Sequence, residues 1–246
     1  GFSDNKKHGN GIFTYKNGDR YDGEFINGNM EGKGEYQFSN GNIYIGEWKD
    51  DQSHGKGEYI FKNGNTYIGE FRNGKRDGDG KFIYPDGEKY EGGYKNGKKE
   101  GHGVFTFKNG NTYEGDFWDG KKNGEGTFLY PSGNIYKGQW ENDMRSGLGT
   151  LTFHEGGKYE GEWKSGIIEG EGHYQYPNGD SYQGQFVAGK MHGKGSYTYA
   201  NGNEYHGNWQ TDEMKGQGVY STFTGNYYEG VFSDGELNGY GIYRSS

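Results

Sequence analysis

The chain has 246 residues, of which 28% are hydrophobic and 52 are glycine, and its formal net charge is −8. The negative charge argues against nucleic acid as a partner, because phosphate binding needs a basic surface, and the lack of cysteine excludes disulfides and thiol chemistry. No apolar run is long enough to span a membrane and no signal peptide is visible, so we expect a cytoplasmic protein.

A tyrosine returns every 23 residues from Tyr21 to Tyr228, without insertion or deletion. A fixed period of this size predicts a repeat array, and the 18% of aromatic residues held on that period argue against disorder. The chain begins inside a repeat, so we expect it to be an excerpt of a longer array. We predict one array over residues 1–246, with a partial repeat at 1–20, nine full repeats at 21–227 and a shortened repeat at 228–246.

We number each repeat from its tyrosine as position 1. Position 3 is glycine, position 5 is aromatic, positions 12 and 14 are glycine, and positions 16 and 18 are mostly aromatic. The alternation of Tyr159, Gly161 and Trp163 with polar residues is typical of a strand, and this density of glycine excludes helices. Gly or Asp at position 8 and Asn-Gly pairs such as 40–41 predict turns. Each repeat is therefore predicted to form two short strands joined by turns.

The aromatic and glycine positions also suggest how the strands pair. Pairing position 1 with 18, 3 with 16 and 5 with 14 places a ring opposite each glycine, where it would cover the bare backbone. The predicted fold is all-β, an elongated, single-layer, twisted antiparallel meander of about ten 23-residue β-hairpin repeats that stays open. One face would be aromatic and the other charged, and the sheet would curl around its aromatic face into a groove.

The pattern Tyr-x-Gly-x-(Trp/Phe), with Gly or Asp at position 8, Gly-x-Gly at 12–14 and aromatic residues at 16 and 18, resembles the MORN repeat (membrane occupation and recognition nexus). The resemblance covers almost the whole chain. It implies a twisted single-layer sheet of hairpins and a non-enzymatic role in scaffolding. In some members it also implies dimerisation, peptide binding in the groove or attachment to membranes.

Motifs that would indicate catalysis have simpler explanations here. Gly69 and Gly74-Lys75 have the spacing of a phosphate loop, but neither the following Ser or Thr nor a helix is present. The seven histidines lack the spacing of metal ligands, and the carboxylates are spread along open strands, where no pocket would shift their pKa values. We predict no enzyme activity, no metal and no cofactor.

Four large rings in the groove are candidate anchors for a protein partner, because aromatic residues dominate such contacts. They are Trp140, Trp163, Phe186 and Trp209.

Pairs of basic residues occupy positions 9 and 10 of three successive repeats. They are Lys75 and Arg76, Lys98 and Lys99, and Lys121 and Lys122. They are either solvated turn residues or a basic stripe that binds an anionic phospholipid or an acidic partner.

Self-association is predicted at the last strand, whose backbone would be unpaired in an open meander. The residues involved are Gly239, Tyr240, Gly241, Ile242 and Tyr243. Pairing of two such strands would give a two-fold symmetric homodimer. On the charged face, Ile45 opposite Ile60 and Ile68 opposite Ile83 would add an apolar contact surface.

Together these features predict a structural scaffold for protein–protein interaction and self-association at a membrane-associated cytoskeletal structure. Two alternatives remain open. The chain is a recognition module for phosphoinositides or anionic membranes, or it is an accessory regulatory domain of a larger enzyme.

Overall fold

The computed structural model describes the backbone of residues 1–246 and every side chain except that of Phe2. These residues form strands and turns and no helix, and strands β3 to β23 follow one another in an antiparallel meander that is not closed. The predicted all-β, open meander of hairpin repeats is confirmed. The fold divides into an N-terminal unit, Gly1–Lys121, and a C-terminal unit, Lys122–Ser246.

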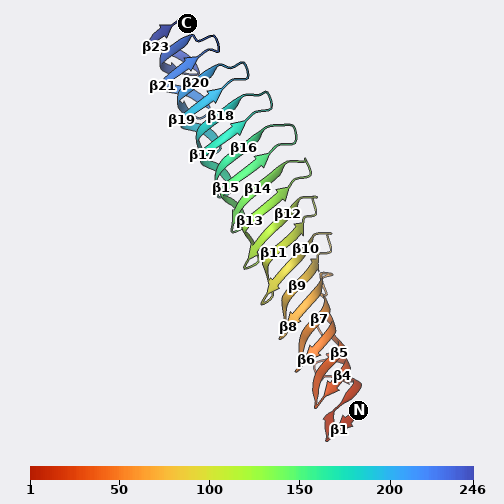
Figure 1. Cartoon of the computed structure of the whole chain (residues 1–246). Coiled ribbons are helices and arrows are strands. Elements are labelled where there is room, and N and C mark those ends of the chain that lie inside the picture. The colour runs from red at the N-terminus through yellow and green to blue at the C-terminus, as the bar shows by residue number, and fades with distance from the viewer. The chain divides into compact units, whose positions relative to one another are not determined.

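In the N-terminal unit the short strands β1 and β2 pair with each other, and the later strands follow side by side in chain order (Figure 1). Its strands are β1 (Phe2–Ser3), β2 (Lys6–Lys7), β3 (Gly9–Thr14), β4 (Arg20–Ile26), β5 (Asn29–Gln37), β6 (Ile43–Lys49), β7 (Gln52–Ile60), β8 (Thr66–Arg72), β9 (Lys75–Ile83), β10 (Lys89–Lys95), β11 (Lys98–Thr106) and β12 (Thr112–Trp118).

The C-terminal unit continues the alternation of seven-residue and nine-residue strands. Its strands are β13 (Lys121–Leu129), β14 (Ile135–Glu141), β15 (Met144–Thr152), β16 (Lys158–Lys164), β17 (Ile167–Gln175), β18 (Ser181–Val187), β19 (Lys190–Thr198), β20 (Glu204–Gln210), β21 (Glu213–Ser221), β22 (Tyr227–Ser233) and β23 (Glu236–Arg244).

The hairpin within each repeat is closed by a two-residue turn at positions 7 and 8. Both residues have positive φ, as in Asn27 (51°) with Gly28 (96°) and in Asp50 (49°) with Asp51 (61°). A two-residue turn of this kind has a twist that matches the twist of the flanking strands, and it favours Asn, Asp and Gly. The turn predicted from Gly or Asp at position 8 is confirmed.

The cross-strand register differs from the predicted one by two residues. Tyr44 pairs with Tyr59 and Gly46 pairs with Gly57 within one hairpin, and Tyr59 pairs with Tyr67 of the next repeat. Ring 1 therefore faces ring 16 and glycine 3 faces glycine 14, so the predicted pairing of positions 3 with 16 and 5 with 14 is wrong. Between repeats, the glycine at position 12 does face the next position-5 ring, as Gly55 faces Phe71. The cause is the tight turn, because it pairs position 6 with position 9 and so starts the second strand three residues earlier than expected.

A bulge explains why each repeat contains two glycines so close together. In the Tyr44 hairpin the register shifts after Gly46, and Gly55 at position 12 lies in the bulged strand with a φ of 57°. Position 12 therefore needs glycine for its backbone conformation. Position 14 needs it for a different reason, which is the space occupied by the tyrosine ring.

The tyrosine at position 1 lies over the glycine pair of its own hairpin. A Cβ atom on Gly57 would lie 2.5 Å from the hydroxyl oxygen of Tyr44, and that hydroxyl donates a hydrogen bond to the carbonyl of Glu47 at 2.9 Å. From Tyr21 to Tyr205, the nine tyrosines at position 1 are at most 1% exposed. One ring thus covers two glycines, since Tyr44 lies over Gly46 on its own strand and over Gly57 on the neighbouring strand.

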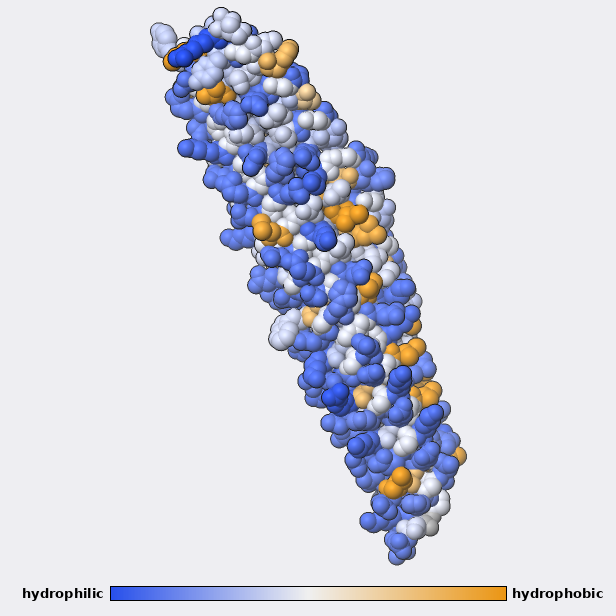
Figure 2. Space-filling view, viewed as in Figure 1, coloured by the Kyte–Doolittle hydropathy of each residue, from blue (hydrophilic) through white to orange (hydrophobic). Residues whose placement is uncertain are grey.

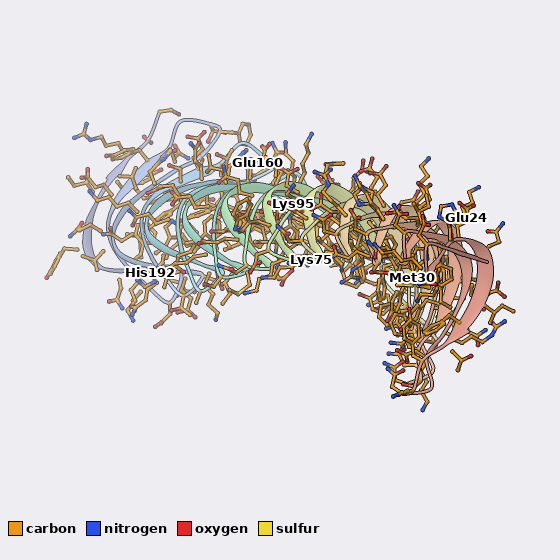
Figure 3. The ribbon with its side chains drawn as sticks, turned by 90° about the horizontal axis from the view of Figure 1, so that it is seen from below. Glu24, Met30, Lys75, Lys95, Glu160 and His192 are labelled. Atoms are coloured by element: carbon orange, nitrogen blue, oxygen red, sulfur yellow. The ribbon has the colours of Figure 1, made fainter. Side chains whose placement is uncertain are left out.

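The sheet has an aromatic face and a polar outer face. In the N-terminal unit, Met30 lies on the inner side of the curved strands and Glu24 on the outer side (Figure 3). The surface seen in Figure 2 is mainly hydrophilic, with hydrophobic residues scattered over it. We therefore expect apolar contacts with a partner on the aromatic face.

The two-residue register shift also changes the outer face. The sequence predicts two isoleucine pairs there, Ile45 with Ile60 and Ile68 with Ile83. The structure instead pairs Ile45 with Glu58 and Ile68 with Lys81, so these predicted pairs are wrong.

Candidate partner-binding face

The floor of the aromatic face is a chain of edge-to-face ring contacts. Within each unit, most tyrosines at position 1 contact the position-5 ring of their own repeat and that of the next repeat. Tyr159, for example, has ring centroids 5.5 Å from Trp163 and 5.3 Å from Phe186. Contacts of this geometry contribute about 0.5–1.5 kcal/mol each beyond the burial of area. The floor is therefore a structural layer that links successive hairpins.

The four predicted anchor rings belong to this floor. Trp140, Trp163, Phe186 and Trp209 are between 4% and 6% exposed. The indole N–H groups of the three tryptophans each donate to the carbonyl of a position-14 glycine at 3.2 Å. In the free chain these four rings hold the sheet together, and the surface open to a partner lies beside them.

The more accessible rings of this face lie at positions 16 and 18 and are mostly half-buried, although Phe82, Phe105 and Phe128 at position 16 are buried. In the C-terminal unit they form a continuous row, which we call the ring row, made up of Tyr174, Tyr176, Tyr197, Tyr199 and Tyr220. Successive centroids along it are 4.4, 5.8, 4.8 and 6.0 Å apart. Aromatic residues at these positions are plain in the sequence, but which rings stay accessible depends on the register.

A similar row runs through the N-terminal unit. Tyr59, Phe61, Phe82 and Tyr84 have successive centroids 4.6, 5.8 and 4.6 Å apart. Each unit by itself thus carries an aromatic strip that an extended partner segment would contact.

The basic residues at position 10 lie on the aromatic face. In the N-terminal unit the guanidinium carbon of Arg76 is 5.1 Å from the ring centroid of Tyr94, and Nζ of Lys99 is 4.2 Å from that of Phe105. These are cation–π distances. Lys122, in the C-terminal unit, is also placed over rings, and burial lowers the pKa of its ammonium group.

The basic residues at position 9 lie at the hairpin turns instead. Lys75, Lys98 and Lys121 are exposed, and Lys98 forms an ion pair with Asp119. The six basic residues therefore do not form one stripe, because alternate side chains of a strand point to opposite faces. Those at position 10 join the aromatic face and those at position 9 stay in solvent.

The residues predicted for self-association lie on a strand that is exposed along its whole length. In β23, Tyr240 is fully exposed, Ile242 is 50% exposed and Tyr243 is 56% exposed. Gly239 and Gly241 are also exposed. The strand therefore offers apolar side chains on both of its faces.

A hydrogen-bonded trio on the outer face was not foreseen from the sequence. Ser196 Oγ lies 2.7 Å from Nδ1 of His206, and Nε2 of His206 lies 3.1 Å from Glu204. The order resembles that of a nucleophile, a base and an acid. His206 and Glu204 are about half exposed on an open strand surface, and we give the trio the structural role of linking β19 to β20.

Among the described residues, no group of three His, Asp or Glu side chains is arranged to hold a metal ion. The same residues include no helix of the length and apolarity needed to cross a membrane.

Two solved structures show weak likeness to the chain. One is the wild-type TCP10 domain of Danio rerio CPAP, which is 13% identical, with a TM-score of 0.37 and coverage of 96% of this chain and 99% of that one. The other is the SAS-4 (dCPAP) TCP domain of Drosophila melanogaster, in complex with a proline-rich motif of Ana2 (dSTIL). It is 12% identical, with a TM-score of 0.37 and coverage of 81% and 90%. Scores this low support no conclusion about this chain.

Comparison with protein families gives a direct answer. No curated protein matches the chain, but the family model described as the MORN repeat does. It matches eleven times, at residues 1–20, 21–43, 44–66, 67–89, 90–112, 113–135, 136–158, 159–181, 182–204, 205–227 and 228–246. The matched boundaries are those of the repeats counted from the tyrosines, and the chain belongs to the MORN repeat family.

Proposed function

We propose that the protein is a non-enzymatic scaffold whose aromatic face binds an extended segment of a protein partner. The observation that carries the proposal is the ring row, in which five half-buried tyrosines lie in continuous contact within one unit. Half-buried tyrosines offer large, rigid contact area together with hydroxyl groups for hydrogen bonding, and such residues are enriched at protein interfaces. A scaffold of this kind needs no catalytic cluster.

Variant-dependent capture of partners from a cell extract tests this proposal. Replacing Tyr176 and Tyr199 together by Ser removes two members of the ring row and leaves the buried floor intact. The matched control is Tyr227→Ser. The hydroxyl of Tyr227 donates a hydrogen bond to Glu229 at an exposed site. We expect proteins that are retained by the wild type and the control to be lost with the double variant. Equal retention by all three would refute the role of the ring row.

We extend the proposal to self-association through β23. Its exposed apolar residues, Ile242 and Tyr243, would be covered by the same strand of a second copy, giving a homodimer. Light scattering should give the mass of a dimer for the wild type and of a monomer for the variant Ile242→Lys with Tyr243→Lys. The control is Leu148→Lys, at an outer-face residue that is 65% exposed. A wild-type mass of one chain at all concentrations would end this part of the proposal.

A second candidate function is binding to anionic membranes through the exposed lysines Lys75, Lys98 and Lys121. Each lysine near an anionic surface contributes about 1 kcal/mol, and three would give weak, salt-sensitive attachment. Sedimentation with phosphatidylcholine vesicles, with and without phosphatidylserine, is the test. Binding confined to phosphatidylserine vesicles and lost at raised salt supports it, and no binding at low salt ends it.

The same proposal places the scaffold in the cytoplasm, at a membrane-associated part of the cytoskeleton, which is a setting that MORN proteins serve. A fluorescent fusion that stays evenly spread through the cytoplasm would contradict this placement.

A further inference from the structure

Tyr94 differs from every other residue at its position. The position-5 column otherwise contains only Phe and Trp, namely Phe25, Trp48, Phe71, Phe117, Trp140, Trp163, Phe186, Trp209 and Phe232. Tyr94 is 4% exposed, and its hydroxyl is buried without a hydrogen-bond partner among the described residues. A buried polar group in this state costs free energy, since it has lost its bonds to water and gained none in return. A phenylalanine would avoid that cost, so the hydroxyl calls for an explanation.

Tyr94 lines a cavity of about 350 Å³ on the aromatic face of the N-terminal unit. Its walls include the rings of Phe61, Phe82 and Tyr84, and its charged members are Arg76, Lys98 and Lys99. The guanidinium carbon of Arg76 lies 5.1 Å from the Tyr94 ring centroid and 5.4 Å from that of Phe82. A neutral donor, three cations and apolar walls thus meet in one place.

No carboxylate of the described residues lines the cavity, and two nearby carboxylates are already paired. Asp77 lies 3.5 Å from Arg72 and 3.6 Å from Lys95, and Asp119 pairs with Lys98. Arg76 donates to a backbone carbonyl, that of Gly97, at 2.6 Å. The cavity therefore has a positive local charge.

We propose that this cavity binds a carboxylate carried on a hydrophobic stem, as presented by an acidic side chain of the partner segment. Arg76 and Lys99 neutralise the carboxylate, the hydroxyl of Tyr94 donates to it, and the rings of Phe61, Phe82 and Tyr84 contact the stem. The inference deepens the proposed function and rests on it for the identity of the carrier. Arg76 lies over the ring of Tyr94 in the free chain, and binding of the carboxylate would require its guanidinium to turn toward the ligand.

The aromatic walls of the cavity favour a carboxylate over a phosphate dianion, because removing a doubly charged group from water costs more than removing a singly charged one. Burial raises the pKa of the Tyr94 hydroxyl, so it stays protonated and remains a donor. The forked guanidinium of Arg76 and the hydroxyl of Tyr94 can donate to the two acceptor oxygens of a carboxylate. Of the exposed lysines at position 9, Lys75 does not line the cavity, whereas Lys98 does and is paired with Asp119.

The test uses 3-phenylpropionate as a probe and follows the backbone amide signals of the intact chain by NMR. We expect binding in the millimolar range, as befits a ligand of this size, with shifts at Gly97 and Lys99. The neutral isostere 3-phenylpropionamide should bind at least tenfold more weakly. Phenyl phosphate should bind no more tightly than the carboxylate.

Two variants are drawn from the chain's own repeats, so the fold is expected to tolerate them. Arg76→Met introduces the residue found at this position in Met30 and Met191, and it should weaken binding at least tenfold. Tyr94→Phe introduces the residue found in Phe71 and Phe117, and it should weaken binding several-fold. The control Arg145→Met changes the same position in the C-terminal unit and should leave binding unchanged.

Equal binding of the acid and the amide would overturn the proposal, as would unchanged binding by Arg76→Met or by Tyr94→Phe. Tighter binding of phenyl phosphate would show a phosphate site and refute the carboxylate assignment. Because the probe needs no partner protein, a failure here is distinct from a failure of the ring row in capture experiments.

Discussion

Replacing tyrosine by phenylalanine is expected to have opposite effects on stability at two tyrosines that contact each other. Tyr67 and Tyr94 have ring centroids 5.0 Å apart in edge-to-face contact, and both rings are almost fully buried. The hydroxyl of Tyr67 donates to the carbonyl of Glu70 at 3.0 Å, whereas that of Tyr94 has no partner. Replacing each by Phe removes one oxygen atom from the same environment. Only the hydrogen bonding of that atom differs.

The expected magnitudes follow from those bonds. Tyr67→Phe removes a hydrogen bond whose net contribution is about 1 kcal/mol, and it leaves the Glu70 carbonyl without this donor. Tyr94→Phe removes an unsatisfied buried group whose penalty is about 1–3 kcal/mol, of which some is offset by the lost packing of the oxygen. We expect Tyr67→Phe to lower local stability by about 1 kcal/mol and Tyr94→Phe to raise it by about 1 kcal/mol.

Amide hydrogen exchange is the suitable assay, because repeat arrays open locally and a single melting temperature averages over many repeats. A change of 1 kcal/mol corresponds to about a fivefold change in exchange rate. Amides of β8 to β11 should exchange about fivefold faster in Tyr67→Phe and about fivefold slower in Tyr94→Phe. Faster exchange in both variants would show that the Tyr94 hydroxyl is satisfied, and it would remove the starting point of the carboxylate site.

Two further predictions concern the repeat itself. Gly172→Ala should destabilise the C-terminal unit by about 3 kcal/mol, because its Cβ would lie 2.5 Å from the hydroxyl of Tyr159. Gly166→Ala should destabilise it by about 1.5 kcal/mol, because Gly166 has a φ of 85° but open space around it. Equal shifts of the urea midpoint would contradict this difference. Alkali should unfold the array, since burial raises the pKa of Tyr67, Tyr136 and Tyr176 to about 12 from an ordinary 10.0. The stabilisation is complete below pH 10 and is lost as the pH rises toward 12, so tyrosine absorbance and circular dichroism should change together, and separate transitions would refute the link.

The strands and turns could be predicted from the sequence because each depends on local chemistry. The alternation of Tyr159, Gly161 and Trp163 fixes a strand, and Asn27 with Gly28 fixes a turn. The register could not, since Gly or Asp at position 8 suits both a two-residue turn and a longer loop. The bulge at position 12 was also hidden, because a glycine needed for positive φ looks the same in sequence as one that makes room for a ring.

The candidate site was partly visible. Position 10 has the same parity as positions 14, 16 and 18, so extending the second strand to position 9 would have placed Arg76 and Lys99 on the aromatic face. The sequence also shows that Tyr94 is the single tyrosine at position 5, where the other repeats have Phe or Trp. What the sequence could not tell was that the hydroxyl of Tyr94 lacks a partner, because that depends on the three-dimensional positions of the surrounding acceptors.

The repeat separates residues that hold the fold from residues that set what the aromatic face binds. Position 1 tyrosine and the glycines at 3, 12 and 14 form the scaffold, while position 10 carries a cation in Arg76 and an apolar side chain in Ile168 and Met191 without change in the strands around it. If binding is set by such variable columns, a site can be transplanted between repeats. The C-terminal unit offers a suitable place, where Phe153, Tyr174 and Tyr176 stand at the positions that Phe61, Phe82 and Tyr84 occupy in the proposed site.

The triple variant Ile168→Arg, Phe186→Tyr and Met191→Lys would reproduce the charged and hydroxyl groups of the carboxylate site in the C-terminal unit. The sheet should accept them, because Arg145 already lies 4.2 Å from the ring centroid of Trp163 at an equivalent position. We expect 3-phenylpropionate to shift the amide of Gly189, the counterpart of Gly97, with an affinity within about tenfold of the original site. A folded triple variant whose Gly189 signal does not respond would show that these columns are insufficient, and that recognition in the N-terminal unit depends on features outside them.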